Sequence, residues 1–397
     1  MRKIISIYFL LAIFFVSTTL KAQVTNISVG ESFQFIEGPV WDGEEFIYFT
    51  DIPNNTIVKY SVVQNTFSAI TTNSNRGNGL MFNADKNLVV CEGSAGRITE
   101  RSINGDIINT IVSEYDNVRF NSPNDLCIDA RGGIYFTDPT FGSTEFQPNN
   151  SVYYLNSEGV TTRLIDDMQK PNGILLSNDG NILYINDTFS DEIRAYDVQE
   201  DGSLVNQRVF GKLIIPANNG TNTGADGMAT DVEGNLYVTS TEGVQVFDKD
   251  GNRTRVISVP EKTTNCTFGG VDKKTLFITA EKNLYTIPLD VMGFQHPFDL
   301  PDFMILSIDD IDGTHADTLF FPNPVINNTV IIKSTNFDFS NTTFMLYNLN
   351  GKKVSEPDFY VGNNSQILKF DDALSRGVYI LKMEGNHPSI TKKIVLE

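Results

Sequence analysis

The stretch GADGMATDVEGNLYVTS, residues 224–240, contains the pattern that decides the fold. A polar side chain, Asp226, stands one residue before a glycine at the head of a short apolar run, and a second apolar run follows. Similar pairs of runs recur about every 40 to 55 residues, which is typical of a β-propeller with one four-stranded blade per repeat. The polar residues before Gly or Asp are Glu37 in IEGPVW, Asn78 in GNGLMF, Asn124 in PNDLCI, Asn172 in PNGILL and Asp226 in ADGMAT.

These five residues occupy equivalent positions, so a propeller would bring them to the same height around one axis. They offer two carboxylates and three amide oxygens, and no nitrogen or sulfur donor. Such donors suit Ca²⁺ or Mg²⁺ rather than zinc or copper, and two negative charges would balance one divalent cation. The pattern therefore predicts a metal site at the mouth of a central channel. Ca²⁺ is the expected cofactor, with Mg²⁺, Mn²⁺ or Zn²⁺ as alternatives.

The competing interpretation is that Asn and Asp before Gly are turn residues, because they tolerate left-handed backbone. A single Asn-Gly pair would favour that interpretation, whereas five residues at equivalent repeat positions favour the metal site. Histidine is absent from all five repeats, since His296, His315 and His387 follow the last clear one. Proton transfer at the ring would therefore use a carboxylate or metal-bound water, and Asp226 is the expected general base.

Composition and the N-terminus indicate an exported protein. The formal net charge of −19 argues against nucleic acid and anionic membranes as partners, because phosphate recognition needs clustered Lys and Arg. Residues 1–22 are predicted to be a cleavable signal peptide, with Arg2 and Lys3 before an apolar run too short for a comfortable membrane span. We expect no membrane insertion of the mature chain, and a monomer.

The repeats set the expected domain boundaries of an all-β chain. Residues 23–290 are predicted to form a six-bladed propeller, in which VTNISVG (residues 24–30) completes the last blade and closes the ring. The sixth repeat, from Cys266, is weaker, and Phe268 or Gly269 stands at its ligand position. Residues 291–317 are expected to be a linker that is partly packed on the propeller, and residues 318–397 a small β-sandwich.

The propeller region resembles the senescence marker protein/gluconolactonase/luciferin-regenerating enzyme family of calcium-dependent six-bladed hydrolases. The matching motifs are EGPVW at Glu37, RFNSPNDLCID…GGIYFTDPTFG over 119–142, PNGILLSNDGNILYINDT from Pro171 and GADGMATDVEGNLYV from Gly224. The resemblance implies metal binding by Glu37, Asn172 and Asp226, with Asp226 also catalytic. It implies that Asn124 contacts metal or substrate.

Substrate contacts depart from the family pattern. Animal members carry an Arg two residues before Asn124, where this chain has Ser122, and Arg119 lies five residues before Asn124. We therefore expect Arg119, Asn124 and Asn78 to line the substrate pocket, without inheriting a preference for sugar lactones. The C-terminal motifs FPNP at Phe321, LYNLNGKKV at Leu346 and GVYILKM at Gly377 resemble a type A sorting domain of the type IX secretion system of Bacteroidota.

Together these features predict a secreted or cell-surface, metal-dependent hydrolase, exported through the periplasm with the type IX machinery as partner. A gluconolactonase-like lactonase that opens a sugar or related lactone is the main hypothesis. An arylesterase or phosphotriesterase-like hydrolase would use the same site on another electrophile, and a calcium-stabilised binding propeller without catalysis is the third alternative. The two carboxylates in the ring favour an enzyme.

Overall fold

The computed structural model describes residues 23–141 and 144–301 of the propeller region. In the C-terminal region it describes residues 329–332, 342–348, 352–361, 366–371, 374–375, 377–384 and 390–396. The predicted signal peptide and most of the predicted linker lie outside these residues. Within them every regular element is a β-strand, and no helix is long and apolar enough to cross a membrane.

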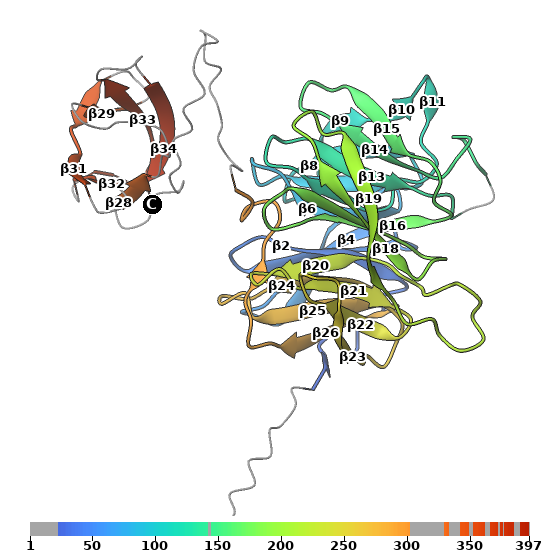
Figure 1. Cartoon of the computed structure of the whole chain (residues 1–397). Coiled ribbons are helices and arrows are strands. Elements are labelled where there is room, and N and C mark those ends of the chain that lie inside the picture. The colour runs from blue at the N-terminus through green and yellow to red at the C-terminus, as the bar shows by residue number, and fades with distance from the viewer. Residues whose placement is uncertain are drawn as a thin grey trace, which may run out of the picture.

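Six antiparallel sheets form a six-bladed β-propeller, as predicted (Figure 1). Five of them have four strands, and the fifth blade carries a short additional strand. The first three blades contain β2 (Ile36–Trp41), β3 (Phe46–Asp51), β4 (Thr56–Ser61), β5 (Thr66–Thr71); β6 (Gly77–Phe82), β7 (Leu88–Glu92), β8 (Arg97–Arg101), β9 (Ile107–Val112); β12 (Leu126–Ile128), β13 (Ile134–Asp138), β14 (Ser151–Leu155), β15 (Thr161–Ile165). The last three contain β16 (Pro171–Leu176), β17 (Ile182–Asp187), β18 (Glu192–Val198), β19 (Leu204–Lys212); β20 (Met228–Asp231), β21 (Leu236–Ser240), β22 (Gly243–Phe247), β23 (Arg253–Ile257); β24 (Thr263–Gly269), β25 (Thr275–Ala280), β26 (Asn283–Pro288), β1 (Thr25–Asn26).

The ring closes through the N-terminal strand. Strand β1 pairs with β26, with Thr25 opposite Thr286, and becomes the outermost strand of the sixth blade. This pairing confirms the expected role of the segment that begins at Val24. It covers the edge of β26, which would otherwise present unpaired backbone groups.

The first strand of each blade lies at the propeller axis, and β2, β6, β12, β16, β20 and β24 contact their neighbours around it. Strands β2 and β16 are buried along their whole length, whereas the outermost strand β5 is largely exposed. Burial of both faces explains why the axial strands lack the alternation of polar and apolar residues expected of a half-exposed strand. The glycines that follow four of the ring positions, Gly38, Gly79, Gly173 and Gly227, allow this close packing.

The repeated ends of the second runs, such as IYFTD and LYVTS, join neighbouring blades. The Oγ1 atom of Thr50 donates to the carbonyl oxygen of Asn78 at 3.1 Å, and that of Thr137 donates to the Asn172 carbonyl at 2.8 Å. Thr239 makes the equivalent bond to the Thr264 carbonyl at 2.9 Å. Each threonine thus fixes the backbone of the next blade at its ring position.

A short segment after the sixth blade crosses the channel. Strand β27 (Gly293–Phe294) pairs with the end of β20, and the Gln295 Nε2 atom donates to the Trp41 carbonyl at 2.9 Å. All six axial strands line a small cavity farther along the channel, and the buried His296 lines it too. His296 packs against Phe294, with ring centroids 4.8 Å apart. The first residues of the predicted linker therefore pack on the propeller and close one end of its channel.

The C-terminal region has two antiparallel sheets. One contains β28 (Thr329–Ile332), β31 (Asp358–Val361) and β32 (Gln366–Lys369), and the other contains β29 (Thr343–Asn348), β30 (Lys353–Ser355), β33 (Gly377–Glu384) and β34 (Ile390–Leu396). Leu368 from the first sheet and Phe344, Leu346 and Leu381 from the second belong to one buried apolar cluster. The two sheets therefore form a small β-sandwich, as the sequence predicted.

Candidate metal centre and active site

The open end of the channel holds a pocket of about 790 Å³. Each of five blades contributes one polar residue from the start of its axial strand or from the residues just before it. All five residues predicted from the repeat spacing line this pocket: Glu37, Asn78, Asn124, Asn172 and Asp226. Residues up to 189 positions apart in sequence are thus brought together, as propeller geometry requires.

A break in the β-ladder accompanies the ring. The register of the axial strand shifts between Glu37 and Val40 in the first blade, and between Pro171 and Ile174 in the fourth. Such a bulge re-aims a side chain that regular pairing would hold on a sheet face. A Cβ atom on Gly173 would lie 2.2 Å from the Asp226 carbonyl oxygen, so only glycine allows the two strands to approach so closely.

The interpretation of the Asn-Gly pairs as turns is wrong. Asn78 and Asn172 lie within β6 and β16, and Gly79 and Gly173 have no positive φ angle. The glycines are therefore required for the approach of neighbouring blades, and the asparagines are not turn residues.

The sixth position differs from the one expected. Thr264, and neither Phe268 nor Gly269, occupies it, because the Thr264 carbonyl accepts the Gly227 N–H at 2.8 Å and its Oγ1 donates to the Ile36 carbonyl at 2.7 Å. Phe268 instead lines the smaller cavity farther along the channel. The expectation was wrong by four or five residues, because FGG at 268–270 is similar to the ring motif and Asn265 replaces the usual glycine after the ring position.

Two acidic residues of the ring, Glu37 and Asp226, are only 3% and 8% exposed and lie within hydrogen-bonding reach of each other. Burial raises the pKa of both carboxyls, and the charge of Glu37 raises the pKa of Asp226 further. Lys262 opposes the increase in both. Binding of a divalent cation between two buried carboxylates would offset their mutual repulsion. The donor set therefore fits such an ion.

The amide side chains of the ring form a hydrogen-bonded chain. Asn78 Nδ2 donates to Asn124 Oδ1, Asn124 Nδ2 donates to Asn172 Oδ1, and Asn172 Nδ2 donates to Thr188 Oγ1 at 3.1 Å. Each accepting oxygen retains a second lone pair. The chain therefore fixes amide oxygens that could join the two carboxylates around a cation. In the described residues no three His, Cys, Asp or Glu side chains form a metal-binding group, so the amides would have to complete the ligand set.

Arg119 lines the pocket, as expected. It ends β11 (Val118–Arg119), which forms a hairpin with β10 (Glu114–Tyr115), and its guanidinium lies 4.0 Å from the ring centroid of Phe146. Ser122 also lines the pocket, and its backbone N–H donates to Asp138 Oδ1 at 2.7 Å.

Sequence reasoning missed Arg76 and Lys262, which line the same pocket. Neither belongs to a repeat motif, although each lies two residues before a ring position, Asn78 and Thr264. It also missed Asp125, which takes the glycine position of the third blade. Burial, followed by the charge of Glu37, raises the pKa of Asp125 to about 8, and its side chain lines the smaller cavity.

Comparison with known protein families gives two matches. A family model described as the SMP-30/Gluconolactonase/LRE-like region matches residues 35–282. A second, described as the Secretion system C-terminal sorting domain, matches residues 319–397. This domain, of the type IX system, indicates secretion or display at the cell surface, as the C-terminal motifs predicted.

Individual relatives agree with the first match. A gluconolactonase of Zymomonas mobilis is 28% identical over 309 residues, covering 71% of this chain and 84% of the relative. The structure of a gluconolactonase from Xanthomonas campestris is 30% identical and covers 68% of this chain and 90% of its own, with a TM-score of 0.61. A regucalcin from Agrobacterium tumefaciens, described as a calcium-binding protein, shares the fold at 20% identity and a TM-score of 0.57, covering 67% of this chain and 93% of its own.

Proposed function

Because the chain belongs to the SMP-30/gluconolactonase/LRE-like family, we propose that it is a secreted, divalent-metal-dependent lactonase. The observation that carries the proposal is the convergence of Glu37, Asp226, Asn124 and Asn172 at the floor of an open pocket. Similarity to two gluconolactonases supports the reaction class. The proposed cofactor is Ca²⁺, which suits an all-oxygen donor set.

The proposed roles follow from the surroundings of each side chain. Glu37, Asn124, Asn172 and Asp226 would hold the cation, which when bound supplies Lewis-acid polarisation of the lactone carbonyl. Asp226 accepts a proton from the attacking water and returns it to the ring oxygen as the acyl C–O bond breaks. Without the cation, burial and then the charge of Glu37 raise the pKa of Asp226, and Lys262 opposes the increase. A bound cation would also favour the ionised form, which is the form that accepts a proton.

The remaining pocket residues have supporting roles in this proposal. Asn78 donates to Asn124 and thereby orients its amide. Glu37 is held by the Gly38 N–H, which donates to its Oε2 atom at 2.9 Å, so we assign it to charge balance and metal binding rather than to proton transfer. Arg119 lies on the pocket wall, where it can contact the part of the substrate remote from the reacting carbonyl.

The experiment is a panel of γ- and δ-lactones, an aryl ester and a phosphotriester, assayed with a chelator and after Ca²⁺ is restored. We expect lactone hydrolysis that the chelator removes and Ca²⁺ restores. Calorimetry should show Ca²⁺ binding in the wild type and none in Asp226→Ala. Turnover of only the aryl ester or phosphotriester would replace the proposed substrate class. Unchanged Ca²⁺ affinity in Asp226→Ala would show that the ring is not the metal site.

A further inference from the structure

Three basic side chains line the candidate active-site pocket without an acidic partner. They are Arg76, Arg119 and Lys262, of which Arg76 is exposed and the other two are partly exposed. In the described part of the chain no carboxylate lies within ion-pairing distance of any of them, although other basic residues, such as Arg194 and Arg208, are paired with aspartates. None of these three charges is therefore paired with a carboxylate in a salt bridge among the described residues.

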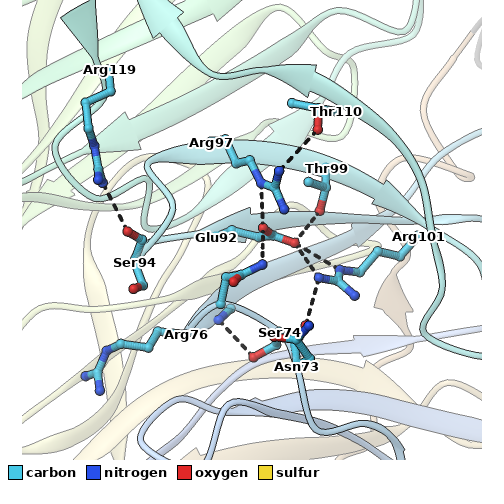
Figure 2. A network of polar contacts seen from close by, with 12 residues as sticks. Asn73, Ser74, Arg76, Glu92, Ser94, Arg97, Thr99, Arg101, Thr110 and Arg119 are labelled. Atoms are coloured by element: carbon cyan, nitrogen blue, oxygen red, sulfur yellow. Dashed lines mark hydrogen bonds and ion pairs between the residues drawn. The ribbon is translucent and has the colours of Figure 1, made fainter.

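Blade two, which begins just after Arg76, also contains two arginines that stabilise the fold by ion pairing (Figure 2). Arg97 and Arg101 converge on the carboxylate of Glu92, with N–O distances of 2.7 and 2.5 Å, and Thr99 adds a hydrogen bond at 2.9 Å. In Figure 2 the guanidinium of Arg76 points away from this network and meets none of it. Blade two thus pairs two arginines with the carboxylate of Glu92 and leaves Arg76 available to a ligand.

Arg119 is fixed in place by contacts that leave part of its guanidinium unused. Its Nε atom donates to the Phe120 carbonyl at 3.1 Å, and its Nη2 atom donates to the carbonyls of Ser94 at 3.2 Å and Asn121 at 3.5 Å. Phe146 supports one face of the group. The two N–H groups of Nη1 have no partner among the described residues, so a pre-oriented donor pair remains for a ligand.

The backbone of Arg76 is fixed as well. Its N–H donates to Asn55 Oδ1 at 2.7 Å, and its φ angle of 54° is one that non-glycine residues seldom adopt. Such conformations persist where the surrounding structure requires them and are frequent at binding sites. The backbone of Arg76 is therefore held by the fold at a position from which its exposed side chain lines the pocket.

The net charge of the pocket lining has the opposite sign to the net charge of the whole protein. Among the described residues that line it, only Glu37 and Asp226 are acidic and three are basic, whereas the chain as a whole carries −19. The two acids are buried in the ring, so the wall above them is positively charged. A cleft lined by one sign of charge concentrates ligands of the opposite sign.

We infer that the substrate carries, besides its uncharged lactone, an anionic group, a carboxylate or a phosphate, which Arg119 and Arg76 bind while the ring acts on the lactone. The inference rests on the proposed lactonase function and specifies its substrate class as acidic lactones. Guanidinium groups bind both anions through paired N–H donors. Lys262 stands nearer the carboxylates of the ring, since its charge acts on both Glu37 and Asp226.

The test uses pairs of lactones that differ in one group. Glucaro-1,4-lactone differs from glucono-1,4-lactone by a carboxylate, and 6-phosphoglucono-1,5-lactone differs from glucono-1,5-lactone by a phosphate. We expect kcat/KM to favour an acidic member by roughly tenfold or more, the value of one charge-assisted hydrogen bond. The difference should lie in KM and should shrink at high salt. The pair with the larger preference identifies the anionic group.

Arg119→Gln and Arg76→Gln should each reduce the ratio of acidic to neutral kcat/KM toward one. The matched control is Arg208→Gln, which removes the same charge from an exposed residue that is ion-paired with Asp197 and does not line the pocket. The control should leave the ratio unchanged. Equal or better hydrolysis of both neutral lactones by the wild type, or a ratio unaffected by both pocket variants, would overturn the inference while leaving the lactonase function intact.

Binding of the open-chain acids separates failure of the inference from failure of the proposed function. Calorimetry should show that glucarate, with two carboxylates, binds the wild type more tightly than gluconate, and that Arg119→Gln removes the difference. If no lactone is hydrolysed but glucarate is still preferred, the reaction class is wrong and the anion site stands. Equal affinities for the two acids would rule out the anion site.

Discussion

The two ends of the central channel are built by the same six axial strands, but they differ in almost every property. At the mouth the strands begin with polar residues around a pocket of about 790 Å³. Farther along, Trp41, Met81, Leu175 and Phe268 surround a cavity of about 50 Å³, which the segment Phe294–His296 covers. Burial lowers the pKa of His296 to about 4, so this histidine is neutral at neutral pH.

Two aspartates at opposite ends of one strand show what the difference means. Asp231, at the end of β20, accepts the backbone N–H groups of Glu233 and Asn235 at 3.0 Å each and the Tyr237 hydroxyl at 3.0 Å. Asp226, just before β20, faces the carboxyl of Glu37. A carboxylate whose acceptor sites are filled by its own protein stabilises the fold, whereas one left beside another acid is available for a ligand.

The largest effect on stability is expected at the closed end. Trp41 is 1% exposed and packs in a cluster with Ile36, Ile47 and Phe49. Trp41→Ala should lower the free energy of unfolding by about 3–5 kcal/mol, because it leaves a cavity in a close-packed region. Urea unfolding would measure the loss. Lactonase activity per folded molecule should persist at low temperature, and its disappearance there would show that the two ends are not independent.

At the mouth the expected effect is on turnover. Asp226→Asn keeps the shape and an oxygen donor but removes the proton acceptor, so hydrolysis should fall by about 10²-fold or more. The matched control is Asp231→Asn at the other end of β20. It should lose about 1.5–3 kcal/mol of stability through its hydrogen bonds and retain kcat. Normal turnover by metal-bound Asp226→Asn would assign the catalytic role to another residue.

Acid should affect the mouth through Glu92. Burial alone would raise the pKa of Glu92, but hydrogen bonds from Arg101, Arg97 and Thr99 outweigh it and lower the pKa. Its contribution to stability is therefore present above the unfolded value of about 4.3 and is lost as the pH falls through the folded value, by at most about 1.4 kcal/mol per pH unit.

Asn75 and Asn73 beside the pocket are bound to Glu92 and Arg101, so this loop should lose amide protection only as the pH falls below about 4.3. The segment Phe294–His296 should lose protection first, because the lowered pKa of the buried His296 costs stability from pH 6.5 downward. Hydrogen exchange between pH 7 and 3, corrected for intrinsic rates, would show the order. Simultaneous loss at both ends would contradict the assignment to Glu92.

The smallest effect is expected from removing the sorting domain. Among the residues that the structure describes, none of the ring or of the closed end lies beyond Leu300, so a chain from Gln23 to Gly313 should keep its thermal transition and its metal-dependent activity. In the native host the same truncation should leave the protein in the periplasm. Normal secretion of the truncated protein into the medium would contradict the export role of the C-terminal domain. Loss of the thermal transition would show that the propeller does not fold without it.

Much of the mouth could be predicted because it is repeated. Glu37, Asn78, Asn124, Asn172 and Asp226 were found from spacing alone, since a propeller converts equivalent positions in sequence into neighbours around an axis. The pairing of β1 with β26 was predictable for a related reason, because an open ring would leave an unpaired edge.

The rest of the site does not repeat. Thr264 could not be identified at the sixth position, because its neighbour Asn265 breaks the motif and the bulge between Thr263 and Asn265 shifts the register. Arg76 and Lys262 belong to loops whose direction depends on contacts such as the Arg76 N–H to Asn55. His296 reaches the channel only because β27 pairs with β20, far from it in sequence.

The sequence by itself determined the number of blades, the closing strand and the five-residue ring, because the period of a repeat fixes which residues share a height on the axis. The tertiary structure alone decided which charges are neutralised and which remain for a ligand. Arg101 and Arg76 are the same type of residue in the same repeat, but of these two only Arg101 contacts the carboxylate of Glu92. Pairing depends on where side chains meet in space, and local sequence carries no information about the partner.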